Sequence, residues 1–155
     1  MSSTTLHVPR GFTELECDPF MEPLGPIYGR PGTDGLIEVG LHISPRHANL
    51  YGGAHGGMLA ALVDFALGIN VLAAARGADG PIALGTVSLN VDYVSGASPG
   101  EWLVVKPAID KRSGRIRFCS CVVETSDGRI VLRATAVLSA IKPNQPQIRG
   151  AVSAT

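Results

Sequence analysis

The chain has 155 residues, enough for one domain with a full hydrophobic core. Hydrophobic residues make up 45% of the sequence and charged residues 17%, a composition that excludes a disordered chain. Lysine plus arginine and aspartate plus glutamate balance at 13 each. With no basic excess and no basic run, the charge pattern argues against nucleic acid or a membrane surface as a partner.

The two ends of the chain differ from its middle. The start MSSTTLHVPRGF lacks the charged beginning and apolar core of a signal peptide, so we expect a cytoplasmic protein. Residues 1–11 and 142–155 are poor in apolar residues and are expected to be flexible tails. Residues 12–141 contain no linker or repeat and are predicted to form one domain.

The first half of this domain predicts short elements and then one long helix. PFMEPLGPIYG holds too many prolines for a long helix, so we expect a short helical turn that leads into a strand. RPGTDG is a turn signal, and LIEVGLHIS after it predicts a strand. From His55 to Ala75 the apolar residues are nearly continuous, with Gly77 beyond them as a candidate C-cap. Because a mid-span aspartate such as Asp64 costs about 2.5–3.5 kcal/mol on membrane-insertion scales, we interpret this helix as buried in a globular domain.

After the helix the pattern changes to a period of two. TVSLNVDYV alternates polar with apolar residues, which predicts one face with Thr86, Ser88, Asn90 and Asp92 and another with Val87, Leu89, Val91 and Tyr93. Three further strands, EWLVVKPAID, RIRFCSCVVET and RIVLRATAVLSAI, follow in meander order. The predicted fold class is α+β, an antiparallel sheet wrapped around one central helix. A helix this apolar must be covered on most sides, so the sheet curls around it or a second subunit helps.

The stretch NLYGGAHGG lies just before and at the start of the predicted helix. Glycines there allow close approach of a ligand, and Gly56 and Gly57 fall where the first helical N–H groups lack partners inside the helix. That end is suited to bind an oxyanion or a polarised carbonyl oxygen. A tight turn beneath the sheet explains the same glycines equally well.

Asp64 lies nine residues after His55. Nine residues advance a helix by about 13.5 Å and turn it by about half a revolution, so the two side chains cannot form a dyad in one chain. Either they share no site, or a two-fold dimer has composite sites. The structural alternative for Asp64 is a buried carboxylate capped by hydroxyl or backbone groups.

Together these residues form the pattern N-x-x-G-x-x-H-G-G followed after six residues by D, in Asn49, Gly52, His55–Gly57 and Asp64. The pattern resembles the signature of the hotdog-fold acyl-CoA thioesterases, in particular the phenylacetate-pathway (PaaI-like) branch of the 4-hydroxybenzoyl-CoA thioesterase superfamily. The resemblance extends from Ile37 to Ile141. It includes TVSLNVDYV, the S-x-x-x-x-G-E turn of residues 95–101 and the Gly-Arg hairpin at residues 114–115.

The resemblance implies a role for each residue of the pattern. Asp64 is the carboxylate that attacks the thioester or activates water, and Gly57 offers its N–H to the thioester oxygen. Asn49 helps to hold substrate or water, and His55 supports Asn49 and the loop. Thr86 matches the hydroxyl that orients water beside the acid of its own chain. Asp64 and Thr86 would face Gly57 and Asn49 of a partner chain, in agreement with the half-turn argument.

Further residues are candidates for binding the substrate, an acyl-CoA. Gly56 lies beside the predicted N–H donor, and Met58 and Phe65 are predicted to form an apolar wall that accepts an aryl or medium-chain acyl group. The phosphates of CoA require cations, for which the turn around Gly114 offers Lys111, Arg112 and Arg115. Ordinary solvated turn charges explain these cations as well. Weaker candidates are Arg30, Arg46 and Arg76.

No cofactor is implied, because CoA belongs to the substrate, and no metal site is expected. His42 and His47 have no third ligand at a suitable spacing. The odd set of cysteines, Cys17, Cys119 and Cys121, is interpreted as reduced packing residues.

The sequence therefore predicts a thioesterase that is at least a dimer, and a tetramer would cover the outer face of the sheet. The alternatives are a non-catalytic acyl-CoA binder and a hotdog hydratase, which resembles this fold but uses a D-x-x-x-x-H pattern that this chain lacks.

Overall fold

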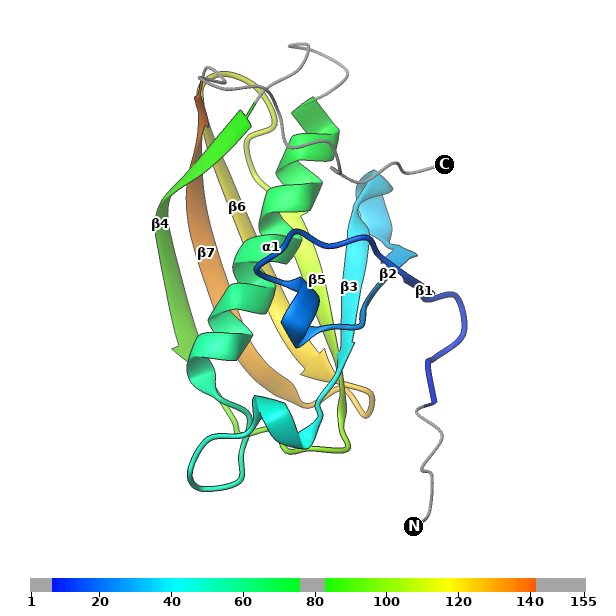
Figure 1. Ribbon diagram of the computed structural model, residues 1–155. Coiled ribbons are helices and arrows are strands. Elements are labelled where there is room, and N and C mark those ends of the chain that lie inside the picture. Colours follow the sequence, from blue (N-terminus) through cyan, green and yellow to red (C-terminus); the bar gives the residue numbers. More distant parts are fainter. Residues whose placement is uncertain (1–6, 76–82, 142–155) are drawn as a thin grey trace.

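The computed structural model describes residues 7–75 and 83–141, which form one long helix and a seven-stranded antiparallel sheet. Figure 1 shows the helix α1, Gly56–Ala75, lying across one face of the curved sheet. This confirms the predicted α+β hotdog fold. The strands are β1 (Thr13–Glu14), β2 (Ile27–Pro31), β3 (Ile37–His42), β4 (Ala83–Tyr93), β5 (Trp102–Ile109), β6 (Ile116–Thr125) and β7 (Ile130–Ile141). The short 3₁₀ helices are Glu22–Leu24, Thr33–Gly35 and Pro45–His47.

The order of strands in the sheet is β1-β2-β3-β5-β6-β7-β4. The meander predicted for the last three strands is confirmed by the pairing of β5 with β6 and of β6 with β7. The strand that precedes them in sequence, β4, instead pairs with β7 at the edge of the sheet. Within the described residues, β4 has no neighbour on its other side.

A β-bulge in β4 changes which of its side chains face the helix. Thr86 pairs with Leu138 and Ser88 with Val137, so Val87 has no opposite residue and is 62% exposed. Before the bulge Thr86 lies on the inner face, and after it Leu89, Val91 and Tyr93 share that face, since an extra residue reverses the alternation. The strict alternation predicted from the sequence, which put Thr86 on the face opposite Tyr93, was therefore wrong.

The core lies between α1 and the inner face of the sheet. Leu62, Val63 and Ala66 on the helix are almost completely buried, as are Val105, Val123 and Leu132 on the strands. By length and composition α1 could cross a membrane, but half of its residues are buried against the rest of the domain. Its one buried polar residue, Asn70, accepts a hydrogen bond from the N–H of Ile37 at 2.7 Å and donates to the Ile37 carbonyl at 2.9 Å, which fixes α1 against β3.

The outer face of the sheet is partly covered by the first described residues. Phe12, Trp102 and Val104 form a buried cluster there, and Val8 packs against it. The Phe12 and Trp102 rings meet edge to face, with centroids 5.2 Å apart. The candidate C-cap Gly77, the candidate cation Arg76 and the predicted tail 142–155 lie outside the described residues.

Candidate active site

Asp64 and Thr86 form a hydrogen-bonded pair between the helix and the edge strand. The Thr86 hydroxyl donates to Asp64 Oδ1 at 2.9 Å. The bulge at Val87 makes this contact possible, because it turns Thr86 toward the helix. Asp64 is only half-buried and Thr86 is exposed, so the pair is open to solvent rather than sealed in the core as the sequence suggested. A half-exposed carboxylate beside a hydroxyl is suited to activate water or to attack an electrophile.

The start of α1 is held by hydrogen bonds within the chain. The Gly57 N–H donates to His55 Nδ1 at 2.9 Å, so the imidazole caps the helix. The N–H of Leu59 donates to the His55 carbonyl at 3.1 Å and closes the first turn. The N–H that the sequence assigned to the thioester oxygen thus has a partner in this structure. The His55 ring binds Gly57, whereas the resemblance implied that it supports Asn49.

Asn49 organises the loop in front of the helix. Its side-chain oxygen accepts hydrogen bonds from the N–H groups of Tyr51 at 2.8 Å and Gly53 at 3.3 Å. Gly52 adopts a φ of 84°, a conformation that favours glycine at this tight turn. Gly52 therefore serves the tight turn that the sequence offered as the structural alternative for these glycines. The predicted role of Asn49 in holding substrate stays a prediction.

A hollow of about 390 Å³ opens beside the start of the helix. Ala54, Gly56 and Leu59 line it on one side, and the chain segment 93–97 after β4 lines it on the other. The Tyr93 hydroxyl donates to the Gly56 carbonyl at 2.6 Å, so its ring lies directly against the helix start. Among the described residues, no charged side chain lines this hollow. We had not selected Tyr93 from the sequence, because it lies 37 residues from its partner and only alternation marked it.

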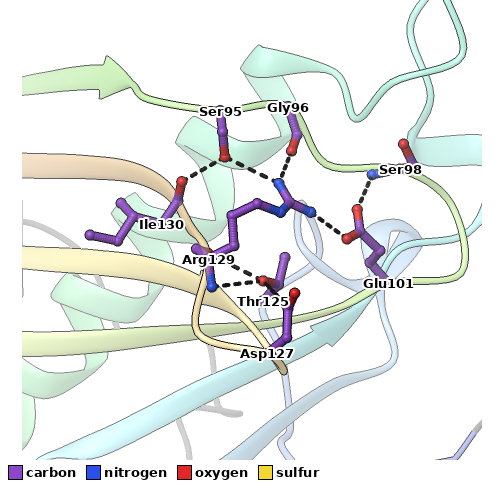
Figure 2. A network of polar contacts seen from close by, with 8 residues as sticks. All are labelled: Ser95, Gly96, Ser98, Glu101, Thr125, Asp127, Arg129 and Ile130. Carbon is purple, nitrogen blue, oxygen red and sulfur yellow. Dashed lines mark hydrogen bonds and ion pairs between the residues drawn. The ribbon is translucent and has the colours of Figure 1, made fainter.

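A network of polar contacts holds the 95–101 turn behind this hollow (Figure 2). The Arg129 guanidinium donates to Ser95 Oγ at 3.1 Å and to the Gly96 carbonyl, and it forms an ion pair with Glu101. Glu101 also accepts a hydrogen bond from the Ser98 N–H at 2.7 Å. The sequence did not indicate a role for Arg129, because arginines were interpreted only as phosphate ligands.

The cationic turn predicted to bind CoA lies at the other end of the sheet. Lys111, Arg112 and Arg115 are exposed there, and the buried Arg117 donates to the Arg112 carbonyl at 2.7 Å and so braces the turn. Tyr93 pairs with Leu132 at one end of β7. At the other end of β7, Thr86 pairs with Leu138, and Ile116, which follows the cationic turn, pairs with Ser139. Seven residues of strand span about 23 Å, so the turn lies near the Asp64–Thr86 end and far from Gly57.

Two other predicted substrate-binding residues are in the core. Met58 is 7% exposed and Phe65 9%, and both pack in the main hydrophobic cluster. Neither lines the hollow at the helix start. The acyl wall predicted from these two side chains is therefore not open in the single chain.

Gly57 and Asp64 are also too far apart to act on one atom within one chain. Seven residues of helix separate their Cα atoms by about 10.5 Å along the axis. The N–H groups of the first turn point toward the N-terminus, away from Asp64. The structure brings Asp64 to Thr86 and the cationic turn, and it places Gly57, Asn49 and the hollow at the opposite end.

Cysteine and metal chemistry find little support in the described residues. Burial raises the pKa of the Cys119 thiol to about 11 and that of Cys121 to about 12, so both stay protonated at neutral pH. Both side chains face the helix in the core, in keeping with a packing role. Across residues 7–75 and 83–141 there is no cluster of three histidine, cysteine, aspartate or glutamate side chains that could hold a metal ion.

A hotdog domain with a carboxylate on its central helix and a hydroxyl on the adjacent edge strand is the class of protein that the structure defines, and sequence comparison specifies the family. The model of the Thioesterase superfamily matches residues 51–132. The "Putative esterase PA0474" of Pseudomonas aeruginosa is 35% identical over 133 residues, 85% of this chain and 96% of that protein. Human acyl-coenzyme A thioesterase 13 is 31% identical over 101 residues, 65% of this chain and 69% of that protein. The chain belongs to the Thioesterase superfamily.

Solved structures agree with this assignment. A mutant of the phenylacetic acid degradation protein PaaI of Thermus thermophilus is 28% identical, with a TM-score of 0.64 over 80% of this chain and 100% of that one. The likeness to PaaI proteins confirms the branch that the sequence pattern indicated. A hypothetical thioesterase of Streptococcus pneumoniae, solved with coenzyme A, shares the fold at 21% identity, with a TM-score of 0.65 over 74% of this chain and 85% of that one. Family membership indicates a thioesterase or esterase activity.

Proposed function

We propose that this protein hydrolyses acyl-CoA thioesters to a free acid and CoA. The observation that carries the proposal is the Asp64–Thr86 pair, a half-exposed carboxylate in an otherwise apolar helix with a hydroxyl donating to it at 2.9 Å. Because it is half-exposed, this carboxylate avoids the cost of burial and stays open to a substrate. The acyl-CoA thioesterase and the CoA-bound thioesterase among the similar proteins support CoA thioesters as the substrate class.

In the proposed reaction, the Gly57 N–H polarises the thioester carbonyl at the positive end of α1. Asp64 either attacks the carbonyl carbon and gives a mixed anhydride, which water then hydrolyses, or removes a proton from the water that attacks. In both routes the carbon–sulfur bond breaks and CoA leaves as the thiol. His55 Nδ1 accepts the Gly57 N–H in this structure, so this hydrogen bond has to break before the N–H can bind the thioester oxygen.

The proposed site is composite, with Asp64 and Thr86 from one subunit and Gly57 and Asn49 from its partner. The edge strand β4 supports this arrangement, since its outer side is unpaired among the described residues and Val87 on it is 62% exposed. A two-fold axis beside β4 would set the two helices antiparallel and bring Gly57 of the partner subunit toward Asp64. Association of two such dimers would cover the exposed outer face, where Phe118 is 45% exposed.

In this arrangement the CoA phosphates extend to the cationic turn on the subunit that provides Asp64. Lys111, Arg112 and Arg115 are exposed there, and Gly114 with a φ of 83° shapes the turn. No charged group from the part of the chain that the structure describes lines the hollow at Gly56, so the two halves of the substrate meet different chemistry on the two subunits. A cytoplasmic location stays a prediction.

The test is release of CoA thiol from a panel of acyl-CoA thioesters by the wild type and by Asp64→Asn. We expect the variant to lose activity by about 10²–10⁴, the usual contribution of a general base, while its melting temperature stays near that of the wild type. Asp92→Asn, an exposed carboxylate on the same edge strand, is the matched control and should keep full activity. Equal activity of the wild type and Asp64→Asn would contradict a catalytic role. A folded wild type that binds acyl-CoA but releases no thiol would instead be a non-catalytic binder.

A further inference from the structure

We propose that the hollow beside the helix start holds the acyl group and that Tyr93 determines which acyl groups fit. The inference rests on the proposed function and specifies its substrate class: apolar acyl groups without hydroxyl substituents at their far end. The hollow has a volume of about 390 Å³, which lies within the range of small-molecule pockets. Because Gly56 lines it, whatever occupies the hollow is adjacent to the Gly57 N–H and so to the thioester carbonyl.

Several polar groups around the hollow already have hydrogen-bond partners. The Tyr93 hydroxyl donates to the Gly56 carbonyl at 2.6 Å, and the Ser95 hydroxyl donates to the Ile130 carbonyl at 2.6 Å. The N–H groups of Val94 and Ser95 both donate to the Val131 carbonyl, at 2.8 and 3.1 Å. A hydroxyl or amide of the substrate would lose its water there without gaining an equivalent partner.

Two carbonyl groups of the same wall are engaged as well. The Ala97 carbonyl accepts the N–H of Ala54 at 2.7 Å, and the Gly96 carbonyl accepts the Arg129 guanidinium (Figure 2). This favours the acyl group over the pantetheine arm of CoA as the occupant, because the arm carries two amides that need partners. The charged end of CoA is drawn toward the cationic turn of the subunit that provides Asp64, away from the hollow.

Tyr93 limits the hollow through its close contact with the helix. A Cβ atom on Gly56 would lie 3.2 Å from the Tyr93 Cζ and hydroxyl oxygen, so a larger residue would push the ring back by a few tenths of an ångström. The ring is 53% exposed and presents its remaining surface to the hollow and to solvent. The Arg129 network holds Ser95 and Gly96 on the same side of the hollow, so the ring is the bulky side chain whose removal enlarges the space.

The experiment compares kcat/KM of the wild type, Tyr93→Phe and Tyr93→Ala on butanoyl-, hexanoyl-, octanoyl- and decanoyl-CoA and on ω-hydroxyoctanoyl-CoA. We expect the wild type to favour octanoyl-CoA over its ω-hydroxy counterpart by about tenfold or more. Tyr93→Ala should shift the preference toward longer chains. Tyr93→Phe should keep both the chain-length preference and the discrimination against the ω-hydroxyl, because it keeps the ring and frees the Gly56 carbonyl only beside the thioester, far from the end of the chain.

Two measurements keep the inference separate from the proposed function. Inhibition by free CoA reports the part of the site outside the hollow and should be equal in all three proteins. Calorimetric binding of the same thioesters to Asp64→Asn, with and without Tyr93→Ala, reports acyl preference without turnover. Tyr28→Phe, on the outer face against Trp102, is the control and should match the wild type.

The outcomes separate cleanly. If Tyr93→Ala changes every thioester and CoA inhibition by one common factor, Tyr93 is not a determinant of the acyl group and the inference is wrong. If the wild type releases no thiol but acyl preference in binding to Asp64→Asn depends on Tyr93, the proposed hydrolysis is wrong. The inference that the hollow holds the acyl group is then supported. If neither turnover nor binding depends on the acyl chain, the inference fails even where thiol is released.

Discussion

The two ends of the sheet differ in how their polar groups are satisfied. At the helix start, His55 caps Gly57, Asn49 binds its own loop, Tyr93 binds Gly56 and Arg129 joins the turn behind them. At the other end, Asp64 has the hydroxyl of an exposed edge-strand threonine, and the nearby turn carries exposed cations. The hydrogen bonds at the helix start are made within the chain, whereas the carboxylate–hydroxyl pair and the cations at the other end are open to solvent.

This difference indicates how the work of the site is divided. Preorganised hydrogen bonds fix the backbone where a carbonyl oxygen and an apolar group would be received. The open carboxylate and cations lie on an unpaired strand and a solvated turn, where a second subunit and a charged substrate can approach. Neither end has both an N–H donor at a helix start and the carboxylate, and the complete reaction needs both.

The strongest test of this comparison is complementation between two inactive variants. Gly57→Pro removes the N–H, and proline is tolerated in the first helical turn. Asp64→Asn removes the carboxylate, and each variant alone should lose activity by about 10² or more. Co-expressed with different tags, the pair should regain about a quarter of the wild-type sites, because each mixed dimer has one intact site.

The control for complementation is a mixture of the two purified variants before subunits exchange, which should stay inactive. Both variants also need to be folded, as judged by their melting temperatures. Mixed dimers that remain as inactive as the parents would show that one chain provides the whole site, and the division between the two ends would then be wrong.

A smaller effect is expected from the hydroxyl of Thr86. Thr86→Val keeps the shape but removes the donor to Asp64, and a hydrogen bond to a carboxylate at an exposed site corresponds to about tenfold in rate. We expect kcat to fall by that factor with little change in KM, and Thr86→Ser to restore it. Ser88→Ala, beyond the bulge on the outer face, is the matched control. A change in KM alone, or failure of Thr86→Ser to restore kcat, would contradict an orienting role.

The sequence predicted the elements and much of the motif because these depend on local patterns. Continuous apolar residues marked α1 within one residue of its start, and the period of two marked β5, β6 and β7. The spacing of the glycines, His55 and Asp64 identified the family, and the half-turn between His55 and Asp64 required only helix geometry. These signals need no knowledge of which elements meet in space.

The parts that sequence reasoning missed depend on long-range contacts. The position of β4 at the edge follows from pairing with β7, and the bulge at Val87 follows from the registers of two strands rather than from either alone. Alternation placed Thr86 on the wrong face, although the family pattern had placed it beside Asp64. Tyr93 and Arg129 gain their roles from partners more than 30 residues away, which no local pattern encodes.

The smallest expected effect concerns the pH dependence of the helix-start end. His47 is 2% exposed, its Nδ1 accepts the Ser44 N–H at 3.1 Å, and its carbonyl accepts the His55 N–H at 2.7 Å. Burial lowers the pKa of His47 below its ordinary value of 6.5, and the charges of Arg46 and His42 act in the same direction. The folded state therefore prefers the neutral ring. The stability it contributes is present above about pH 6.5 and is lost as the pH falls below that value.

Urea unfolding at about pH 7.5 and about pH 5.5 measures this contribution. We expect the wild type to lose free energy of unfolding at the lower pH and His47→Gln to lose less. His7→Gln, which removes an exposed histidine, is the matched control and should follow the wild type. Because His47 binds the residue that caps α1, the acid-induced loss should also increase hydrogen exchange at Gly57 before the amides of β6 respond. Equal protection losses at Gly57 and in β6 would show that acid acts on the whole domain and that the helix-start end has no separate pH response.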